Sequence, residues 1–471
     1  MAADSSVSDR PRADQIRPPE SRVREPLTSS RGRTQKALRS HRGGVRASAV
    51  GRKPVAAAPR SGALGKNTHN LSTVLPDDVA RRAESKSARY QLLHQLWEES
   101  TLERVRKCRR VSVVEGGGVG LRLASGAAGF SGLAKCGSPW SCPVCAAKIA
   151  RTRADDLEKV LAWAVEQGHT VAMVTLTSRH SAGMRLEDCW NATTTAWNRV
   201  TSGRAWAGES DVNYRKRLDN WAAKGSRRKR PVQGLGIVQR YDVLGFARAL
   251  EVTHGENGWH VHLHVVVIFE GQQSPGMITN AAEDMWPAWE KGLASKGFTA
   301  LRDHGGLDVR VSTGETVQGL AQYFTKQLAL EATNSGNKIG RGKESRTPFQ
   351  IAWSIFADGD AASLDLWQEW ERVSKGRKQL TWSNGLRELA GLAEQELTDE
   401  EVAELELGDS DALTLPPETW AAMRHQQVEL LLAAEGQGMA GAVSWLDQRG
   451  LRWLAVPRGA LPACAPPSRT A

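Results

Sequence analysis

The fold of this chain is predicted most clearly by residues 254–269. They read His-Gly-Glu-Asn-Gly-Trp-His-Val-His-Leu-His-Val-Val-Val-Ile-Phe. The second half of this stretch alternates histidine with Val or Leu and then runs into β-branched and aromatic residues, which is typical of a strand. Asn257-Gly258 is a hairpin signal, because a type I′ turn needs positive φ at both central residues. We therefore expect antiparallel strands at about residues 246–253 and 260–269.

The three histidines of this stretch are candidate metal ligands. Side chains of a strand alternate between its faces, so His260, His262 and His264 share one face. If the turn is Asn257-Gly258, Glu251 lies opposite His264 on that face, and a slip of one residue would remove it. Imidazoles with a carboxylate suit Mn²⁺ or Mg²⁺ engaged with a phosphate. The strand does not say which two histidines bind, and histidines that only form hydrogen bonds are the alternative.

The histidine strand carries a family resemblance. His-hydrophobic-His on a strand resembles the metal motif of the histidine-hydrophobic-histidine (HUH) endonucleases, which include replication initiators, conjugative relaxases and some transposases. Thr175-Leu176-Thr177 ends a predicted strand at 170–177 and resembles the first motif of that family. The resemblance implies that this strand lies beside the histidine strand.

A predicted helix places Tyr323 about 60 residues after the histidines of the strand. Residues 317–330, Val-Gln-Gly-Leu-Ala-Gln-Tyr-Phe-Thr-Lys-Gln-Leu-Ala-Leu, place apolar side chains on one stripe. Tyr323 and Lys326 lie off that stripe, three residues apart. A cation near a phenol favours the phenolate, the better nucleophile. An ordinary surface Tyr and Lys are the alternative reading, and Tyr214 and Tyr241 are weaker candidates for the nucleophile.

The order of these segments also matches the resemblance. A Tyr followed by Lys within one helical turn resembles the third motif of the HUH endonucleases, which implies that Tyr323 is the nucleophile and Lys326 its assistant. Some plasmid initiators have a glutamate one turn before the tyrosine, where this chain has Gly319. The residue that activates the closing step therefore stays unassigned.

Three cysteines lie close together before these motifs. Cys136, Cys142 and Cys145 have the tight spacing of a zinc knuckle. Cys108 is the expected fourth ligand of a structural Zn²⁺ site, and His169 is the alternative. The segment Cys-Gly-Ser-Pro-Trp-Ser-Cys-Pro-Val-Cys resembles the cysteine segment of replication initiators from actinobacterial and other Gram-positive plasmids. Residues 375–387 likewise resemble a segment that follows the tyrosine helix in the actinobacterial group.

Composition supports several modules rather than one. The chain has 471 residues and a formal net charge of +11. We predict a disordered basic arm at 1–85, a cysteine-rich zinc module at 86–150, an HUH endonuclease domain at 151–345 and a helical C-terminal region with an acidic stretch at 346–471. The expected fold class is α+β, with a central antiparallel sheet flanked by helices.

The resemblance implies a plasmid replication initiator that nicks origin DNA. The tyrosine would form a 5′-phosphotyrosine link, and the free 3′-OH would prime rolling-circle replication with a host helicase and polymerase. An HUH transposase or relaxase, or a non-catalytic zinc-containing DNA-binding regulator, is the alternative. No apolar run of membrane-spanning length and no secretion signal occur, so we expect a cytoplasmic protein without a membrane partner.

Overall fold

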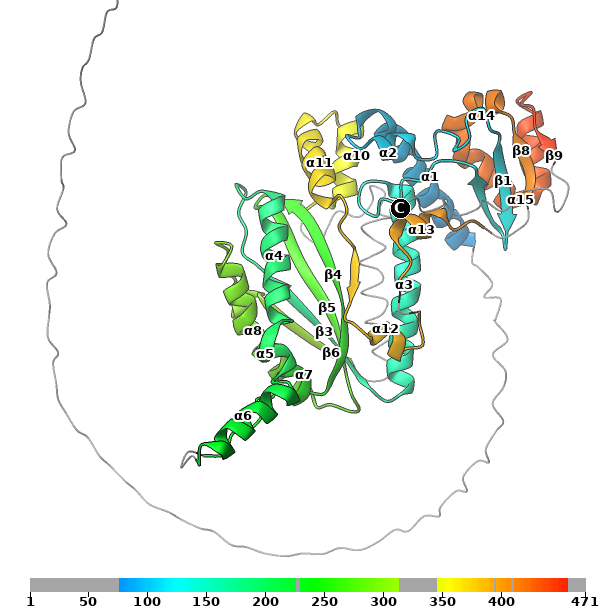
Figure 1. Ribbon diagram of the computed structural model, residues 1–471. Coiled ribbons are helices and arrows are strands. Elements are labelled where there is room, and N and C mark those ends of the chain that lie inside the picture. The colour runs from blue at the N-terminus through cyan, green and yellow to red at the C-terminus, as the bar shows by residue number, and fades with distance from the viewer. Residues whose placement is uncertain (1–75, 226–228, 313–344, 394, 408–410, 456–471) are drawn as a thin grey trace, which may run out of the picture. The chain divides into compact units, whose positions relative to one another are not determined.

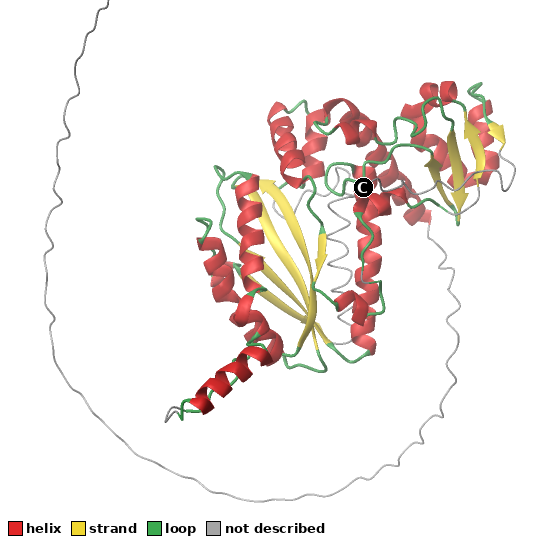
Figure 2. Cartoon of the chain, in the orientation of Figure 1, coloured by secondary structure: helices red, strands yellow, loops and turns green. Residues whose placement is uncertain are grey.

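The computed structural model describes residues 76–225, 229–312, 345–393, 395–407 and 411–455. The predicted helix at 317–330, with Tyr323 and Lys326, lies outside these residues. Helices and antiparallel sheets alternate within the described part, which confirms the α+β class (Figure 1 and Figure 2).

A five-stranded sheet carries the histidine stretch at its centre. The strand order is β6-β3-β5-β4-β7, and every neighbouring pair is antiparallel. The histidine strand β5 therefore has hydrogen-bonded neighbours on both edges, so its backbone is held rigidly. The strands are β3 (Thr170–Thr177), β4 (Val243–Gly255), β5 (Gly258–Phe269), β6 (Leu307–Ser312) and β7 (Leu380–Trp382).

The two faces of this sheet are covered differently. One face, which includes Leu263 and Val265, packs in a large core that contains side chains of α4 (Leu186–Val200) and α8 (Pro275–Ala294). The other face packs Val266 and Ile268 against the apolar side of α3 (Pro143–Glu166). The histidines are on this second face, on the part of β5 that precedes the apolar residues under α3.

The hairpin between β4 and β5 forms as predicted, but its turn type and register differ. Gly255 pairs with Gly258, so Glu256 and Asn257 are the two turn residues. Asn257 has no positive φ, whereas Gly258 has φ +77°. A turn of this kind ends in a left-handed glycine rather than using the type I′ conformation. The predicted pairing of Glu251 with His264 is therefore wrong by two residues, a shift that keeps every side chain on its predicted face.

A second, four-stranded sheet joins residues from both ends of the described chain. Its strand order is β2-β1-β8-β9, and its core includes apolar residues of α15 (Gln427–Asp447). The strands are β1 (Val119–Ala124), β2 (Ala127–Ser131), β8 (Asp411–Leu415) and β9 (Leu454–Ala455). The region predicted as helical after residue 346 thus contributes β7 to the central sheet and two strands to this one.

Three features bear on the predicted domain boundaries. Helix α1 (Pro76–Glu99) begins inside the segment predicted as a disordered arm, and α3 crosses the boundary drawn at residue 150. The pairing of β1 with β8 links the zinc module to the C-terminal region. The remaining helices are α2 (Glu103–Lys107), α5 (Gly203–Ala207), α6 (Asp211–Ala223), α7 (Ile237–Arg240), η1 (Arg302–His304), α10 (Pro348–Ala357), α11 (Ala361–Ser374), α12 (Leu386–Leu389), α13 (Asp399–Glu404), α14 (Pro417–Met423) and η2 (Arg424–Gln426).

Candidate active site and cysteine cluster

Two histidines of β5 are oriented by threonines of the neighbouring strand. Thr175 pairs with His264 and Thr177 pairs with His262 across the β3–β5 ladder. The Nδ1 atom of His264 lies 3.1 Å from Thr175 Oγ1, and Nδ1 of His262 lies 3.0 Å from Thr177 Oγ1. Each hydroxyl fixes the rotation of its imidazole ring and engages Nδ1. Nε2 is then the ring nitrogen that could contact a metal ion, as in metal-binding histidines whose other nitrogen is hydrogen-bonded.

Glu251 joins this face from β4. Its backbone pairs with His262, and its Oε2 lies 2.8 Å from His264 Nε2. Two ligands of one octahedral ion, each about 2.1 Å from it, lie about 3 Å apart, so this separation suits a shared cation. Among the described residues, however, only the cysteines below bring three potential ligands within 4.8 Å of one another. Glu251, His262 and His264 would have to move closer together to share an ion.

The third histidine has different neighbours. The ring of His260 stacks on the ring of His180, with centroids 4.2 Å apart and planes at 22°. The centroid of the His260 ring also lies 3.7 Å from that of His262. His180 follows the Thr-Leu-Thr strand by three residues and is not among the residues that the sequence predicts for the site. The β3–β5 register continued past Thr177 would place His180 opposite Trp259, so strand pairing alone does not predict its contact with His260.

Burial lowers the pKa of His260, His262 and His180, which favours their neutral form. Burial, followed by the neighbouring His262 and His180, lowers the pKa of His260 to about 3. Burial lowers the pKa of His262 to about 4, although Glu251 opposes the shift. The pKa of His180 is also lowered by burial. Neutral imidazoles have a lone pair available for a metal ion or a hydrogen-bond donor.

The tyrosines in the described residues are poor nucleophile candidates. Burial raises the pKa of Tyr90, which lies in the core of the second sheet. Burial and the hydrogen bond to Asp284 raise the pKa of Tyr241. Tyr214 donates to the carbonyl of Pro231 at 3.3 Å. A raised pKa disfavours the phenolate, so Tyr90 and Tyr241 are the opposite of an activated nucleophile.

The four predicted zinc ligands lie together. Cys108, Cys136, Cys142 and Cys145 are buried, and their Sγ atoms lie within 4.8 Å of one another. Cys108 Sγ is 3.7 Å from Cys142 Sγ and 3.6 Å from Cys145 Sγ. A disulfide would need about 2.05 Å. Sulfur atoms bound to one tetrahedral zinc at about 2.3 Å lie about 3.8 Å apart, so these four cysteines could hold a metal such as zinc.

The alternative fourth ligand, His169, is excluded by its position. Its Nδ1 accepts a hydrogen bond from the backbone of Gly271, at the far end of the central sheet. The fold of the cysteine segment brings Cys108, rather than His169, next to the other three cysteines. Cys136 N lies 3.4 Å from Cys108 Sγ, and Cys145 N lies 3.5 Å from Cys142 Sγ. Backbone donors of this kind stabilise thiolate sulfur.

The charges around the cysteines favour a bound cation. Burial raises the pKa of Cys136 and of Cys142, whereas hydrogen bonds from the other cysteines lower the pKa of Cys145. Burial opposes the charge of Arg109, but Tyr90 and the neighbouring thiols raise its pKa overall. Buried thiolates need positive charge, and a zinc ion beside this guanidinium would supply it.

Comparisons with known proteins give two relatives. The chain is 29% identical over 379 residues to "Protein rep" of Streptomyces lividans, covering 68% of this chain and 80% of the relative. It is 36% identical over 247 residues to "Neomycin resistance protein" of Streptomyces cyanogenus, covering 47% of this chain and 51% of the relative. No protein-family model and no solved structure matches. Within the described residues, no helix is long and apolar enough to cross a membrane.

Proposed function

We propose that this chain is a plasmid replication initiator that nicks origin DNA through Tyr323. The observation that carries the proposal is the pair His262 and His264, each held at Nδ1 by a threonine of the adjacent strand. Histidines that only fill a core would not need two threonine hydroxyls, one for each ring, at the centre of a sheet. The relative named "Protein rep" supports a plasmid replication protein. The name of the second relative indicates no DNA chemistry.

We assign the metal-binding pair to His262 and His264, together with Glu251. Both rings are oriented by hydroxyl groups, whereas His260 stacks on His180. The donor set of two imidazoles and one carboxylate fits Mn²⁺ or Mg²⁺. Such an ion would polarise the phosphoryl oxygens of a scissile phosphate. His260 and His180 would then line the edge of the site, where flat neutral rings suit contact with an unpaired base.

The proposed reaction is a transesterification. The phenolate oxygen of Tyr323 attacks phosphorus, and the bond from phosphorus to the 3′ oxygen breaks. The phosphate becomes linked to Tyr323 at its 5′ side, and the released 3′ oxygen takes a proton to become a hydroxyl. Lys326 would stabilise the phenolate or the phosphate charge. The free 3′-OH then primes a host polymerase, assisted by a host helicase.

The cysteine cluster has a structural role in this proposal. All four cysteines are buried and leave no open position for a substrate. Closed tetrahedral zinc sites fold the chain around them, whereas catalytic sites keep one position open. We therefore assign the cysteines to folding the segment before α3 and the histidine face to chemistry.

The proposal is tested by nicking of supercoiled DNA from the replicon that encodes the chain. Wild type with Mn²⁺ or Mg²⁺ is expected to convert it to the open circular form, and Tyr323→Phe is expected to bind DNA without nicking. Tyr241→Phe is the matched control and should nick normally. Nicking by the Tyr323→Phe variant would remove the nucleophile assignment. A wild type that binds but never nicks would leave a non-catalytic DNA-binding protein.

A further inference from the structure

A projecting arm, residues 209–225 and 229–236, is anchored firmly at its base. It consists of α6 and the segment that returns from it. Glu209 is nearly fully buried at the base, and its carboxylate accepts two hydrogen bonds from Arg217, at 2.9 and 2.6 Å. The backbones of Glu209 and Gly234 pair at 2.8 Å. A Cβ at Gly236 would overlap the backbone of Trp206 and Gly208, so the two ends of the arm are in close contact.

Helix α6 uses only one side to contact its own chain. Tyr214, Leu218 and Trp221 follow helical spacing and are half-buried. Tyr214 and Arg217 bond to the carbonyls of Pro231 and Val232 in the return segment. No residue of α6 is fully buried. A helix of 13 residues with so little packing has only marginal stability by itself. The chain nevertheless holds its base rigidly, which suggests that the helix contacts another molecule.

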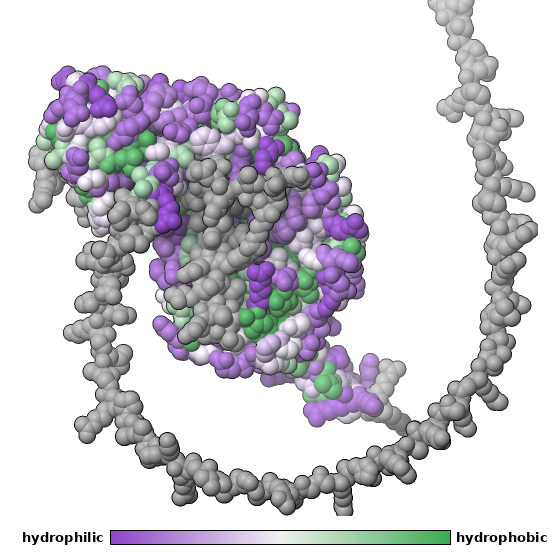
Figure 3. All heavy atoms as spheres, turned by 180° about the vertical axis from the view of Figure 1, so that it is seen from behind, coloured by the Kyte–Doolittle hydropathy of each residue, from purple (hydrophilic) through white to green (hydrophobic). Residues whose placement is uncertain are grey.

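The outward side of α6 is polar and basic. Lys216, Asn220 and Lys224 recur at a spacing of four and therefore lie along one line of the helix. Lys216 and Lys224 are exposed and form no ion pair with any residue that the structure describes. The described residues 211–225 and 229–235 contain six Lys and Arg against two Asp and Glu, a net charge of +4 within a chain of net +11. In Figure 3 this arm shows a mainly hydrophilic surface at the lower right.

We propose that this arm binds the phosphate backbone of duplex DNA that flanks the nick site. The inference rests on the proposed function, which makes DNA the substrate. When lysines without local partners bind the phosphates of a duplex, counterions are released from the DNA, and this release stabilises the complex. Contacts of this kind position the DNA without reading its sequence.

The fold sets the distance from the arm to the histidine face. The chain leaves the arm through α7 and enters β4 at Val243, which pairs with Phe269 at the end of β5. Seven residues of strand separate His262 from Phe269, about 23 Å at roughly 3.3 Å per residue. Figure 1 shows α6 leading away from this end of the sheet. At about 3.4 Å per base pair, the arm would meet phosphates about 7 base pairs or more from the nick.

A protein partner is the competing occupant. Val212, Val232 and Leu235 are exposed on the arm, by 62%, 80% and 55% of their surface. They are scattered among charged residues, however, and charged residues are depleted from the centres of protein interfaces. The excess of positive charge favours the polyanion.

The test uses the full chain, zinc-loaded, and a 30-base-pair duplex of arbitrary sequence. The variant Lys216→Gln/Lys224→Gln removes two charges from the outward side of α6. Lys291→Gln/Lys296→Gln is the matched control, because both lysines are exposed and unpaired among the described residues. Binding is followed by fluorescence anisotropy across a salt series. We expect the slope of log affinity against log salt to fall by about 2 in the α6 variant and not in the control.

Three outcomes decide the proposal. A reduced slope in the α6 variant alone, with nicking of a short single-stranded substrate retained, supports it. Equal slopes in wild type and both variants overturn it, and nicking by wild type would then keep the proposed function intact. A dimer by sedimentation velocity that the α6 variant converts to monomer would also overturn it, because the arm would then contact a second copy of the chain.

Discussion

At the scale of single residues, the histidine face depends on two hydroxyl groups. Thr175 and Thr177 come from β3, and His262 and His264 from β5, so the site is preassembled by strand pairing. In the tautomer that binds metal, Nδ1–H donates to the threonine oxygen and Nε2 carries the lone pair. The hydroxyls should therefore contribute to metal affinity without contacting the ion.

Thr177→Val is expected to weaken metal binding at the histidine face. Valine keeps the shape of threonine and the strand pairing but removes the hydrogen bond to His262. Loss of such a partner lowers metal affinity by about 10- to 100-fold. Titration calorimetry with Mn²⁺ on the zinc-loaded protein measures it. Thr279→Val is the control, because that hydroxyl bonds only to its own helix at Pro275. Equal affinities for both variants would assign the threonine to strand packing alone.

The sequence predicted which residues share the histidine face, but not their pairing. Alternation along a strand depends only on backbone geometry, so Glu251, His262 and His264 could be placed together. Their register depends on the turn. The turn residues are Glu256 and Asn257, followed by Gly258 in the left-handed region, whereas the prediction used Asn257 and Gly258 as a type I′ turn. His180 lies in a loop after β3, where no periodicity indicates direction.

At the scale of elements, the β4–β5 hairpin approaches the loop that follows His180. Gly258 has φ +77°, and a Cβ there would lie 2.9 Å from Ala182 Cα and 3.0 Å from Ser181 O. Positive φ alone costs an alanine roughly 1 kcal/mol. The contact with loop backbone adds a second cost, because neither element can move without disturbing the sheet.

Gly258→Ala is therefore expected to lower the free energy of unfolding by about 2–3 kcal/mol. Gly271→Ala is the matched control, since Gly271 has φ +61° but a Cβ added there would have no neighbouring atom within 4 Å. It should cost only about 1 kcal/mol. Urea unfolding of the two variants isolates the contact. Equal losses of unfolding free energy in the two variants would mean that the loop at Ser181 and Ala182 moves aside without cost.

The cysteine cluster makes a prediction about zinc content. Cys108→Ser is expected to abolish stoichiometric zinc, measured by mass spectrometry of the metal, and to lower the melting temperature. Cys189→Ser is the control, because Cys189 is also buried and free but lies on α4. A Cys108→Ser protein that retains one tightly bound zinc would show that another residue is the fourth ligand.

Strands β3, β4 and β5 of the central sheet were predicted with small errors at their ends, since alternation and β-branched runs specify them, whereas β6 and β7 were not predicted. The second sheet was missed. Its strands are short and come from segments almost 300 residues apart, so no local pattern indicates their pairing. The C-terminal segments that hold β7 and β8 were accordingly predicted as helical.

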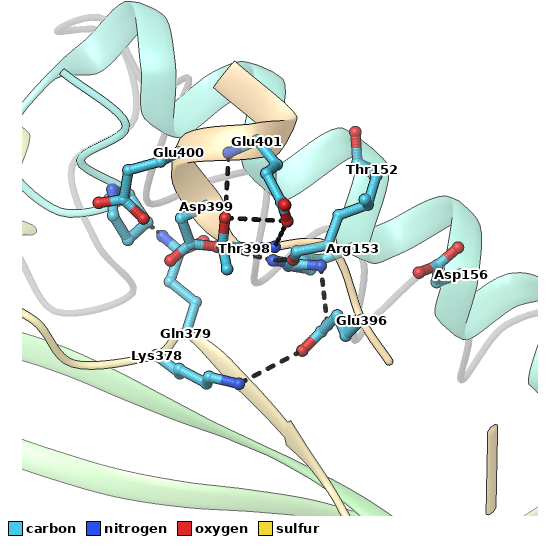
Figure 4. A network of polar contacts seen from close by, with 12 residues as sticks. Thr152, Arg153, Asp156, Lys378, Gln379, Glu396, Thr398, Asp399, Glu400 and Glu401 are labelled. Carbon is cyan, nitrogen blue, oxygen red and sulfur yellow. Dashed lines mark hydrogen bonds and ion pairs between the residues drawn. The ribbon is translucent and has the colours of Figure 1, made fainter. Parts of the chain in front are cut away.

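At the scale of the whole described unit, ion pairs of the acidic stretch after residue 394 link the cysteine segment to α3. Figure 4 shows Arg153 of α3 between Glu396 and Asp399. Its guanidinium nitrogens lie 2.9 Å from Glu396 Oε1 and 2.8 Å from Asp399 Oδ1. Lys135, from the cysteine segment, pairs with Glu404 and Glu406. The stretch therefore neutralises basic residues of its own chain, which a count of charges along the sequence does not reveal.

Arg153→Met is expected to lower the free energy of unfolding by about 3 kcal/mol. The side chain of Arg153 is almost fully buried, and its removal leaves Glu396, exposed by only 9%, without its closest cation. Breaking one side of a buried ion pair costs about 3–5 kcal/mol. Arg452→Met, at an ion pair with side chains exposed by 78% and 61%, should change stability by less than about 1 kcal/mol. Similar small losses of unfolding free energy at both positions would contradict a stabilising role for the ion pairs of Arg153.

We propose that Tyr323 becomes covalently linked to DNA at a metal site formed by the histidine face. The most direct measurement is mass spectrometry of the protein–DNA adduct after reaction with replicon DNA and Mn²⁺, followed by proteolysis and nuclease digestion. We expect nucleotides attached to the peptide that contains Tyr323, and no adduct from His262→Ala/His264→Ala. An adduct on Tyr214 or Tyr241, or a wild-type protein that nicks without any adduct, would contradict it.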